Sequence, residues 1–155
     1  MDDEQRFVTP QSRIDELMAH GAISRAIIVD QTAALGKVED VRGLLLRIRL
    51  PSYRSLPLSC IEKICVTIDG QEVDLSEAAL RIETGWHRLA DLPRLPNTWW
   101  FILDTATLFV PGIVAAGRHE VAVEIVRVEP YITAGRFSFS DTSSAAVLVE
   151  EPFNV

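Results

Sequence analysis

The chain is short of basic residues, cysteines and long hydrophobic runs, and each shortage excludes a class of protein. Its 155 residues include 15 Lys and Arg against 22 Asp and Glu, which gives a net charge of −7. Nucleic-acid binding depends on neutralising phosphates with Lys and Arg, and anionic membranes attract basic segments. No hydrophobic run approaches the ~20 residues of a transmembrane helix. We therefore expect neither a nucleic acid nor a membrane as partner.

Cysteine is scarce, since Cys60 and Cys65 are the only two. Both lie near the start of one predicted strand, at a spacing that points their side chains to opposite faces and disfavours a disulfide. We expect buried, reduced thiols that pack as small hydrophobic groups. The N-terminal sequence MDDEQRF is acidic and lacks the apolar core of a signal peptide. These features indicate a cytoplasmic protein.

Short period-two patterns dominate the rest of the sequence, and such alternation is typical of half-buried strands. The clearest example is the run 43–50, where apolar residues alternate with arginines. We expect a frayed segment over 1–11 and a short helix over about 13–20. The length suits one domain, 1–155. The sequence predicts an all-β fold, an antiparallel β-sandwich of about eight to ten strands with a short N-terminal helix.

Three local features refine this prediction. A strand over 25–30 is followed by a polar turn that contains Gly36. The pair Asp69-Gly70 is a strong signal for a two-residue hairpin. In the longest strand pattern, the apolar alternation changes phase at Val126, which indicates a β-bulge or burial on both faces.

No local pattern points to a catalytic or metal-binding site. The three histidines, His20, His87 and His119, lie on separate predicted elements and lack ligand spacing. There is no G-x-S-x-G nucleophile motif and no glycine-rich phosphate loop. We therefore expect no catalytic, cofactor-binding or metal-ligating residue in this chain. A metal site that the fold assembles from distant segments, which would make the chain an enzyme by itself, stays open as a hypothesis.

Aromatic and basic residues instead collect in predicted connections. The connection over 49–60 reads RLPSYRSLPLSC, is longer than an ordinary hairpin loop and carries a tyrosine and an arginine between two prolines. Trp, Tyr and Arg dominate protein interfaces because they bury much area at low entropic cost. In an adjacent pair of tryptophans on a strand, only one ring faces the core. We predict a partner interface formed by Tyr53, Arg54, Trp86, Trp99 and Trp100.

The same connection carries a family resemblance. Residues 46–73 read LRIRLPSYRSLPLSCIEKICVTIDGQEV. In the beta subunit of bacterial C-glycoside deglycosidases, a strand leads into a loop of the form RLPYYRGLPLS and the next strand ends in V-x-DG-x-x-V, and this chain resembles that family. Further segments match in the same order, namely WHRLADL, WWFILDTATLFV and GRHEVAVEIVRVEPYI. The resemblance covers roughly 26–132.

The resemblance implies a role in a heteromeric complex. Members of the family pair with a larger alpha subunit that resembles a sugar-phosphate isomerase barrel. That partner holds the catalytic residues and a divalent metal, manganese or similar. The complex cleaves the carbon–carbon bond between a 3-oxo-glucosyl group and an aromatic, flavonoid-type aglycone. By this resemblance, the chain is a non-catalytic beta subunit that supports the partner's active site, and Tyr53 and Arg54 project towards the partner.

Two residues of the loop depart from the family pattern. Ser52 stands where the family has an aromatic residue, and Ser55 stands where it has glycine. Glycine adopts positive φ more readily than serine, so the loop is open to another shape. The alternative function is a stand-alone carbohydrate-binding sandwich, in which an exposed tryptophan stacks on a sugar.

Overall fold

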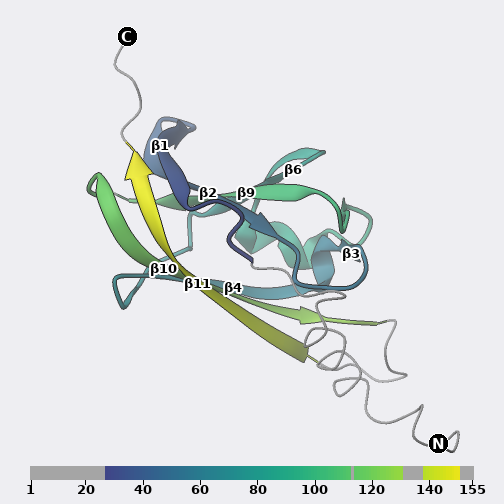
Figure 1. The fold of residues 1–155 in the computed structure, drawn as a ribbon. Coiled ribbons are helices and arrows are strands. Elements are labelled where there is room, and N and C mark those ends of the chain that lie inside the picture. Colours follow the sequence, from purple (N-terminus) through teal and green to yellow (C-terminus); the bar gives the residue numbers. More distant parts are fainter. Residues whose placement is uncertain (1–26, 113, 131–137, 151–155) are drawn as a thin grey trace, which may run out of the picture.

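The computed structural model describes residues 27–112, 114–130 and 138–150. Its strands form the two layers of a sandwich and one short extra pair (Figure 1). One layer contains β1 (Thr32–Val38), β2 (Val41–Arg49), β9 (Thr105–Pro111), β6 (Ala79–Ile82) and β7 (Gly85–Arg88). The other contains β5 (Gln71–Glu72), β4 (Ile61–Ile68), β10 (Gly117–Val128) and β11 (Ser138–Glu150). The short pair is β3 (Leu56–Pro57) and β8 (Trp99–Trp100). The described residues also form the 3-10 helices η2 (Leu58–Cys60) and η3 (Leu89–Arg94).

The two layers belong to one curled nine-stranded sheet with the order β5-β4-β10-β11-β1-β2-β9-β6-β7. The sheet passes from one layer to the other through β11 and β1, which run parallel, while its other paired strands are antiparallel. The predicted all-β, sandwich-like fold is confirmed, with the correction that this mixed sheet contains one parallel pair. The helix predicted over 13–20 and the frayed segment predicted over 1–11 lie outside the described residues.

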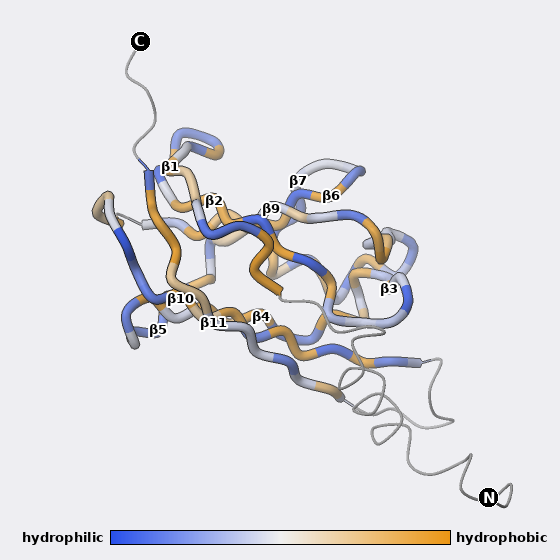
Figure 2. The backbone as a smooth tube through the Cα atoms, viewed as in Figure 1, coloured by the Kyte–Doolittle hydropathy of each residue, from blue (hydrophilic) through white to orange (hydrophobic). Residues whose placement is uncertain are grey.

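The core lies between the layers and is built from alternating strand residues. On β2, Leu44, Leu46 and Ile48 are at most 1% exposed, which confirms the alternation predicted over 43–50. Figure 2 shows hydrophobic and hydrophilic residues interspersed along the strands, whereas the turn between β4 and β5 is hydrophilic. Removing apolar surface from water stabilises the fold by ~25 cal/mol per Å². This core gives the connections at each end of the sandwich a rigid base.

The first described strand begins later than the sequence predicted. The described part of 25–30 makes only an isolated antiparallel bridge to β2, Ile28 with Ile48. The strand β1 begins at Thr32, and the turn after it consists of Glu39 and Asp40, both with positive φ. Gly36 lies inside the strand. A Cβ atom on Gly36 would lie 2.7 Å from a side-chain carbon of the neighbouring strand, so this glycine allows close packing and is not part of the turn.

Two other local predictions are confirmed. Asp69 and Gly70 form the two-residue turn between β4 and β5, with φ values of 51° and 79°. The register between β10 and β4 shifts between Val126 and Arg127, which is the predicted bulge. The register between β10 and β11 stays regular through the same residues. The irregularity is therefore confined to one neighbouring strand.

Candidate functional site

Two connections meet at the end of the sandwich where β2 ends and β9 begins, close to the β3 label in Figure 1. We call residues 50–57 and 98–104 the rim. Inside the rim, β3 pairs with β8, and Leu56 lies opposite Trp100. The long connection predicted over 49–60 is therefore an ordered structure that is paired with a second loop.

Two serines hold the first rim loop in shape. Ser52 is 3% exposed, and its hydroxyl oxygen accepts the backbone N–H of Arg54 at 3.2 Å. The hydroxyl oxygen of Ser55 accepts the backbone N–H of Ile102 at 2.8 Å and so joins the two rim loops. Neither serine is among the residues with positive φ. These departures from the family loop thus provide hydrogen-bond acceptors and do not require the backbone freedom of glycine.

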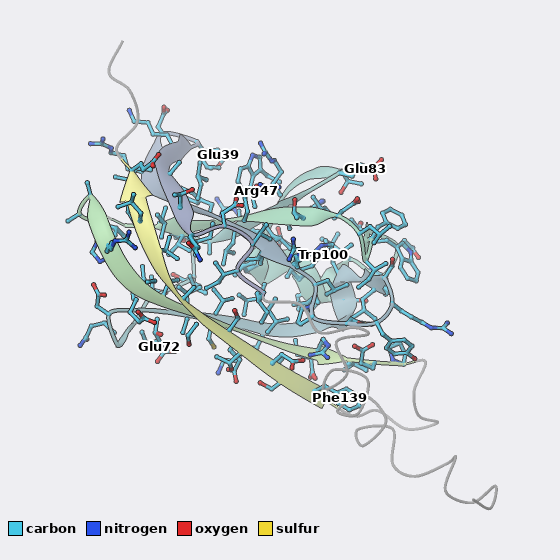
Figure 3. All side chains as sticks on the ribbon, viewed as in Figure 1. Glu39, Arg47, Glu72, Glu83, Trp100 and Phe139 are labelled. Atoms are coloured by element: carbon cyan, nitrogen blue, oxygen red, sulfur yellow. The ribbon has the colours of Figure 1, made fainter. Side chains whose placement is uncertain are left out.

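Trp100 fixes the second rim loop to the core. Its side chain is fully buried between the layers (Figure 3), and its Nε1–H donates to the carbonyl oxygen of Asp104 at 3.0 Å. The backbone N–H of Asp104 in turn donates to the carbonyl oxygen of Phe101 at 2.9 Å. The prediction that one ring of the pair Trp99-Trp100 faces the core is confirmed. The predicted role of Trp100 in a partner interface is wrong, because the buried ring offers no surface to a partner.

The rim carries most of the exposed large hydrophobic side chains in the described part of the chain. Trp99 is 37% exposed, Phe101 49% and Leu103 79%. Outside the rim, this class contains Val41 and Trp86. Grouped exposed apolar side chains mark interaction sites in soluble proteins, whereas scattered ones need no explanation. The rim is therefore the candidate functional site.

The structure brings three of the predicted interface residues to the surface of the rim. Tyr53 and Arg54 lie on the first loop, with the guanidinium carbon 5.5 Å from the tyrosine ring centroid, a cation–π contact. Trp99 lies on the second loop. Trp86 instead lies on the edge strand β7, where its ring packs edge-on against Phe109 with a centroid distance of 6.4 Å. The predicted five residues therefore divide into Tyr53, Arg54 and Trp99 on the surface of the rim, Trp86 on β7, and Trp100, which belongs to the rim by sequence but is buried in the core.

Reasoning from the sequence missed Phe101 and Leu103. A continuous apolar run such as WWFIL is typical of a buried strand, but here the strand ends after two residues and a turn follows. Turns usually consist of Gly, Pro, Asn, Asp or Ser. The sequence does show apolar residues directly before the strand that starts at Thr105. It does not show that a turn falls at these residues, and the turn is what exposes Phe101 and Leu103.

A polar cluster lies at the opposite end of the sandwich, beyond the far end of β4. His119 Nδ1 is 2.6 Å from an Asp69 carboxylate oxygen, and Nε2 is 2.7 Å from the Ala115 carbonyl oxygen. Both partners are acceptors, so the imidazolium form, with two N–H donors, satisfies both contacts. The hydrogen bond to Asp69, followed by that to Ala115, raises the pKa of His119. With both ring nitrogens engaged, His119 is a structural group here and is not placed to act as a general acid or base.

The hydrogen bond from His119 also lowers the pKa of Asp69, and the backbone N–H of Glu120 acts in the same direction. Over the described ranges, no group of three or more His, Cys, Asp or Glu is placed to hold a metal ion. No helix in those ranges is long and apolar enough to cross a membrane. Within the described residues, Cys60 and Cys65 form no disulfide, and both are half-buried where the sequence predicted full burial.

A family model and several known proteins that match most of this chain all indicate the same family. The family model described as C-glycoside deglycosidase beta subunit matches residues 23–131, which include the rim. A 3'-dehydrocarminate deglycosidase beta subunit from a Microbacterium species is 39% identical over 117 residues, or 74% of this chain and 89% of that protein. A C-glycoside deglycosidase beta subunit from Arthrobacter globiformis is 30% identical over 56% of this chain and 70% of that protein. Another, from Microbacterium trichothecenolyticum, is 35% identical over 55% of this chain and 66% of that protein.

Proposed function

The chain belongs to the family of C-glycoside deglycosidase beta subunits, and from this we propose that it is the non-catalytic subunit of a heteromeric deglycosidase. Its partner is an alpha subunit of the sugar-phosphate isomerase barrel type, which supplies the catalytic residues and a divalent metal, manganese or similar. The complex is a cytoplasmic lyase that cleaves the carbon–carbon bond between an oxidised glucosyl group and an aromatic aglycone.

The observation that carries this proposal is the rim, an ordered and exposed apolar surface at one end of a chain with its own core. A supporting subunit needs an exposed surface that binds its partner. If the loops of that surface are already ordered, binding loses less conformational entropy and the affinity is higher. The two rim loops are already joined by the β3–β8 pair and by the hydrogen bond between Ser55 and Ile102. Tyr53 and Arg54 belong to this surface and face the alpha subunit in the proposed complex.

The proposed substrate class follows the relatives. One relative is named for 3'-dehydrocarminate, so a C-glycoside with a 3'-dehydro sugar and an aromatic aglycone is the first class to test. Flavonoid 3'-dehydro-C-glycosides are the second. In this complex the alpha subunit recognises the substrate, and this chain has a supporting part.

The test uses the purified full chain and the purified alpha subunit, with release of aglycone measured by chromatography. We expect turnover of a 3'-dehydro-C-glycoside by the mixture and formation of a complex on size-exclusion chromatography. The rate with the alpha subunit alone should be much lower. Turnover by this chain alone would contradict the proposal. An alpha subunit that forms no complex with this chain, and whose rate does not change on its addition, would also contradict it.

A further inference from the structure

The turn of the second rim loop has a composition that folding does not require. The hydrogen bond from the Asp104 N–H to the Phe101 carbonyl closes a four-residue turn whose central residues are Ile102 and Leu103. Ile102 packs partly against the core, but Leu103 is 79% exposed. Polar residues or glycine suit turn corners better. The exposed leucine therefore adds nothing to the core and calls for another explanation.

This turn is also held rigidly. Trp100 is fully buried beneath it and donates its Nε1–H to the Asp104 carbonyl oxygen at 3.0 Å. From the side, the Ser55 hydroxyl accepts the Ile102 N–H at 2.8 Å. Phe101 and Leu103 are thus presented in one backbone conformation. Binding by a group that is already ordered loses less conformational entropy than binding by a loop that must become ordered.

The charge distribution favours the same surface. The chain has a net charge of −7, yet residues 50–57 and 98–104 contain one cation, Arg54, and one anion, Asp104. The rim is therefore a neutral, apolar end on an acidic molecule. A neutral apolar surface matches an uncharged apolar pocket of a partner better than it matches the acidic faces of a second copy of this chain, because burying unpaired charges costs free energy.

We infer that Phe101 and Leu103 are the anchor of the subunit interface and insert into an apolar pocket of the alpha subunit. This inference rests on the proposed function, because the occupant of the surface is the alpha subunit. Within the interface, Trp99 flanks the anchor on β8, and Tyr53 and Arg54 form its border on the first loop. Central apolar anchors carry most of the binding energy of an interface, and the surrounding contacts mainly exclude water.

The test compares the affinity of matched variants for the purified alpha subunit, measured by calorimetry. Leu103→Asp and Phe101→Asp each place a charge in the proposed pocket, and we expect each to raise the Kd by about thirtyfold or more. Val41→Asp is the matched control, because Val41 is 46% exposed and lies at the other end of β2. We expect the control to change the Kd by less than about twofold. Thermal unfolding of each variant verifies that the chain remains folded.

The possible outcomes separate this inference from the proposed function. If the unmodified chain binds the alpha subunit and both anchor variants bind with unchanged affinity, the anchor is wrong while the proposed function stands. If the control weakens binding as much as the anchor variants do, the anchor is again wrong, because the effect then comes from added charge anywhere on the surface. If the unmodified chain does not bind, the proposed function fails, and the anchor fails with it.

Discussion

Arg127 is buried at the end of β10 with the carboxylate of Glu129 and contacts the partly exposed Asp141, a cluster that no sequence pattern indicated. Its Nε donates to Glu129 at 2.9 Å and its Nη1 donates to Asp141 at 2.5 Å. Arg127 and Glu129 are each 1% exposed. Among the described residues, the second Glu129 oxygen has no hydrogen-bond partner. Desolvation costs several kcal/mol per buried ion, so the buried Glu129 carboxylate depends on the guanidinium of Arg127.

We predict that Arg127→Met lowers the free energy of unfolding by about 3–5 kcal/mol, because it leaves the buried Glu129 carboxylate without its counter-charge. Urea denaturation measures the change. The exposed Arg118, on the same strand, provides a control, and Arg118→Met should change stability by less than about 0.5 kcal/mol. The double variant Arg127→Met/Glu129→Met should be more stable than the single variant. A double variant less stable than Arg127→Met would contradict this account.

At the scale of elements, His119 connects two turns at the end of the sandwich opposite the rim. Its ring joins Asp69, in the turn between β4 and β5, to Ala115, in the connection between β9 and β10. Asp69 and His119 are the titratable groups that line the cleft of about 300 Å³ between these two connections. The imidazolium form makes both hydrogen bonds, so deprotonation breaks at least one link between the turns.

The pH dependence of this link follows from the two pKa shifts. The pKa of folded His119 is raised above its ordinary 6.5, so its contribution is complete below that pH and is lost as the pH rises through the raised value. The pKa of folded Asp69 is lowered below its ordinary 3.8, so its contribution is complete above that pH and is lost as the pH falls through the lowered value. The link is therefore strongest between about pH 4 and 6.5.

We predict that His119→Gln lowers the thermal unfolding temperature more at about pH 6 than at about pH 9, because at high pH the unmodified chain has already lost the protonated link. Scanning calorimetry across this range measures the difference. His87→Gln provides the matched control, because the His87 ring contacts the hydroxyl of Thr84 at 2.7 Å. A difference between His119→Gln and the unmodified chain that stays constant with pH would rule out the protonated link.

The elements themselves show which parts of the fold are local properties of the sequence. The alternation over 43–50 and the turn Asp69-Gly70 were predicted because side-chain direction and turn type depend on adjacent residues. Gly36 was misplaced in a turn because its role is set by a neighbouring strand, which adjacent residues do not specify. The parallel pairing of β1 and β11 was missed for the same reason, since it joins distant segments.

The candidate site was predictable to a similar extent. Residue type and loop length identified Tyr53, Arg54 and Trp99, all of which lie at the rim. Exposure is a property of the folded chain, so the sequence alone did not distinguish the buried Trp100 from the exposed Leu103. Side-chain hydrogen bonds between distant segments, such as the one that joins Ser55 to Ile102, could likewise not be predicted from the sequence.

At the scale of the whole molecule, charge and apolar surface are segregated. The acidic residues that give the chain its net charge of −7 are largely excluded from the rim, which contains one cation and one anion. Salt screens charge–charge interactions but has little effect on the burial of apolar surface. The affinity for the alpha subunit should therefore come mainly from apolar burial and should change little with ionic strength.

We predict that the Kd of the complex changes by less than about threefold between about 50 and 500 mM sodium chloride, because the proposed anchor is apolar and the rim is neutral. Binding should also show a negative heat-capacity change, the robust mark of apolar burial. Calorimetry at several temperatures and both salt concentrations measures the two quantities. Leu103→Asp should make the heat-capacity change less negative, whereas Val41→Asp should leave it unaltered. A complex that loses tenfold or more in affinity over this salt range would be held by charges outside the rim, and the interface would then have to be sought on the acidic faces of the sandwich.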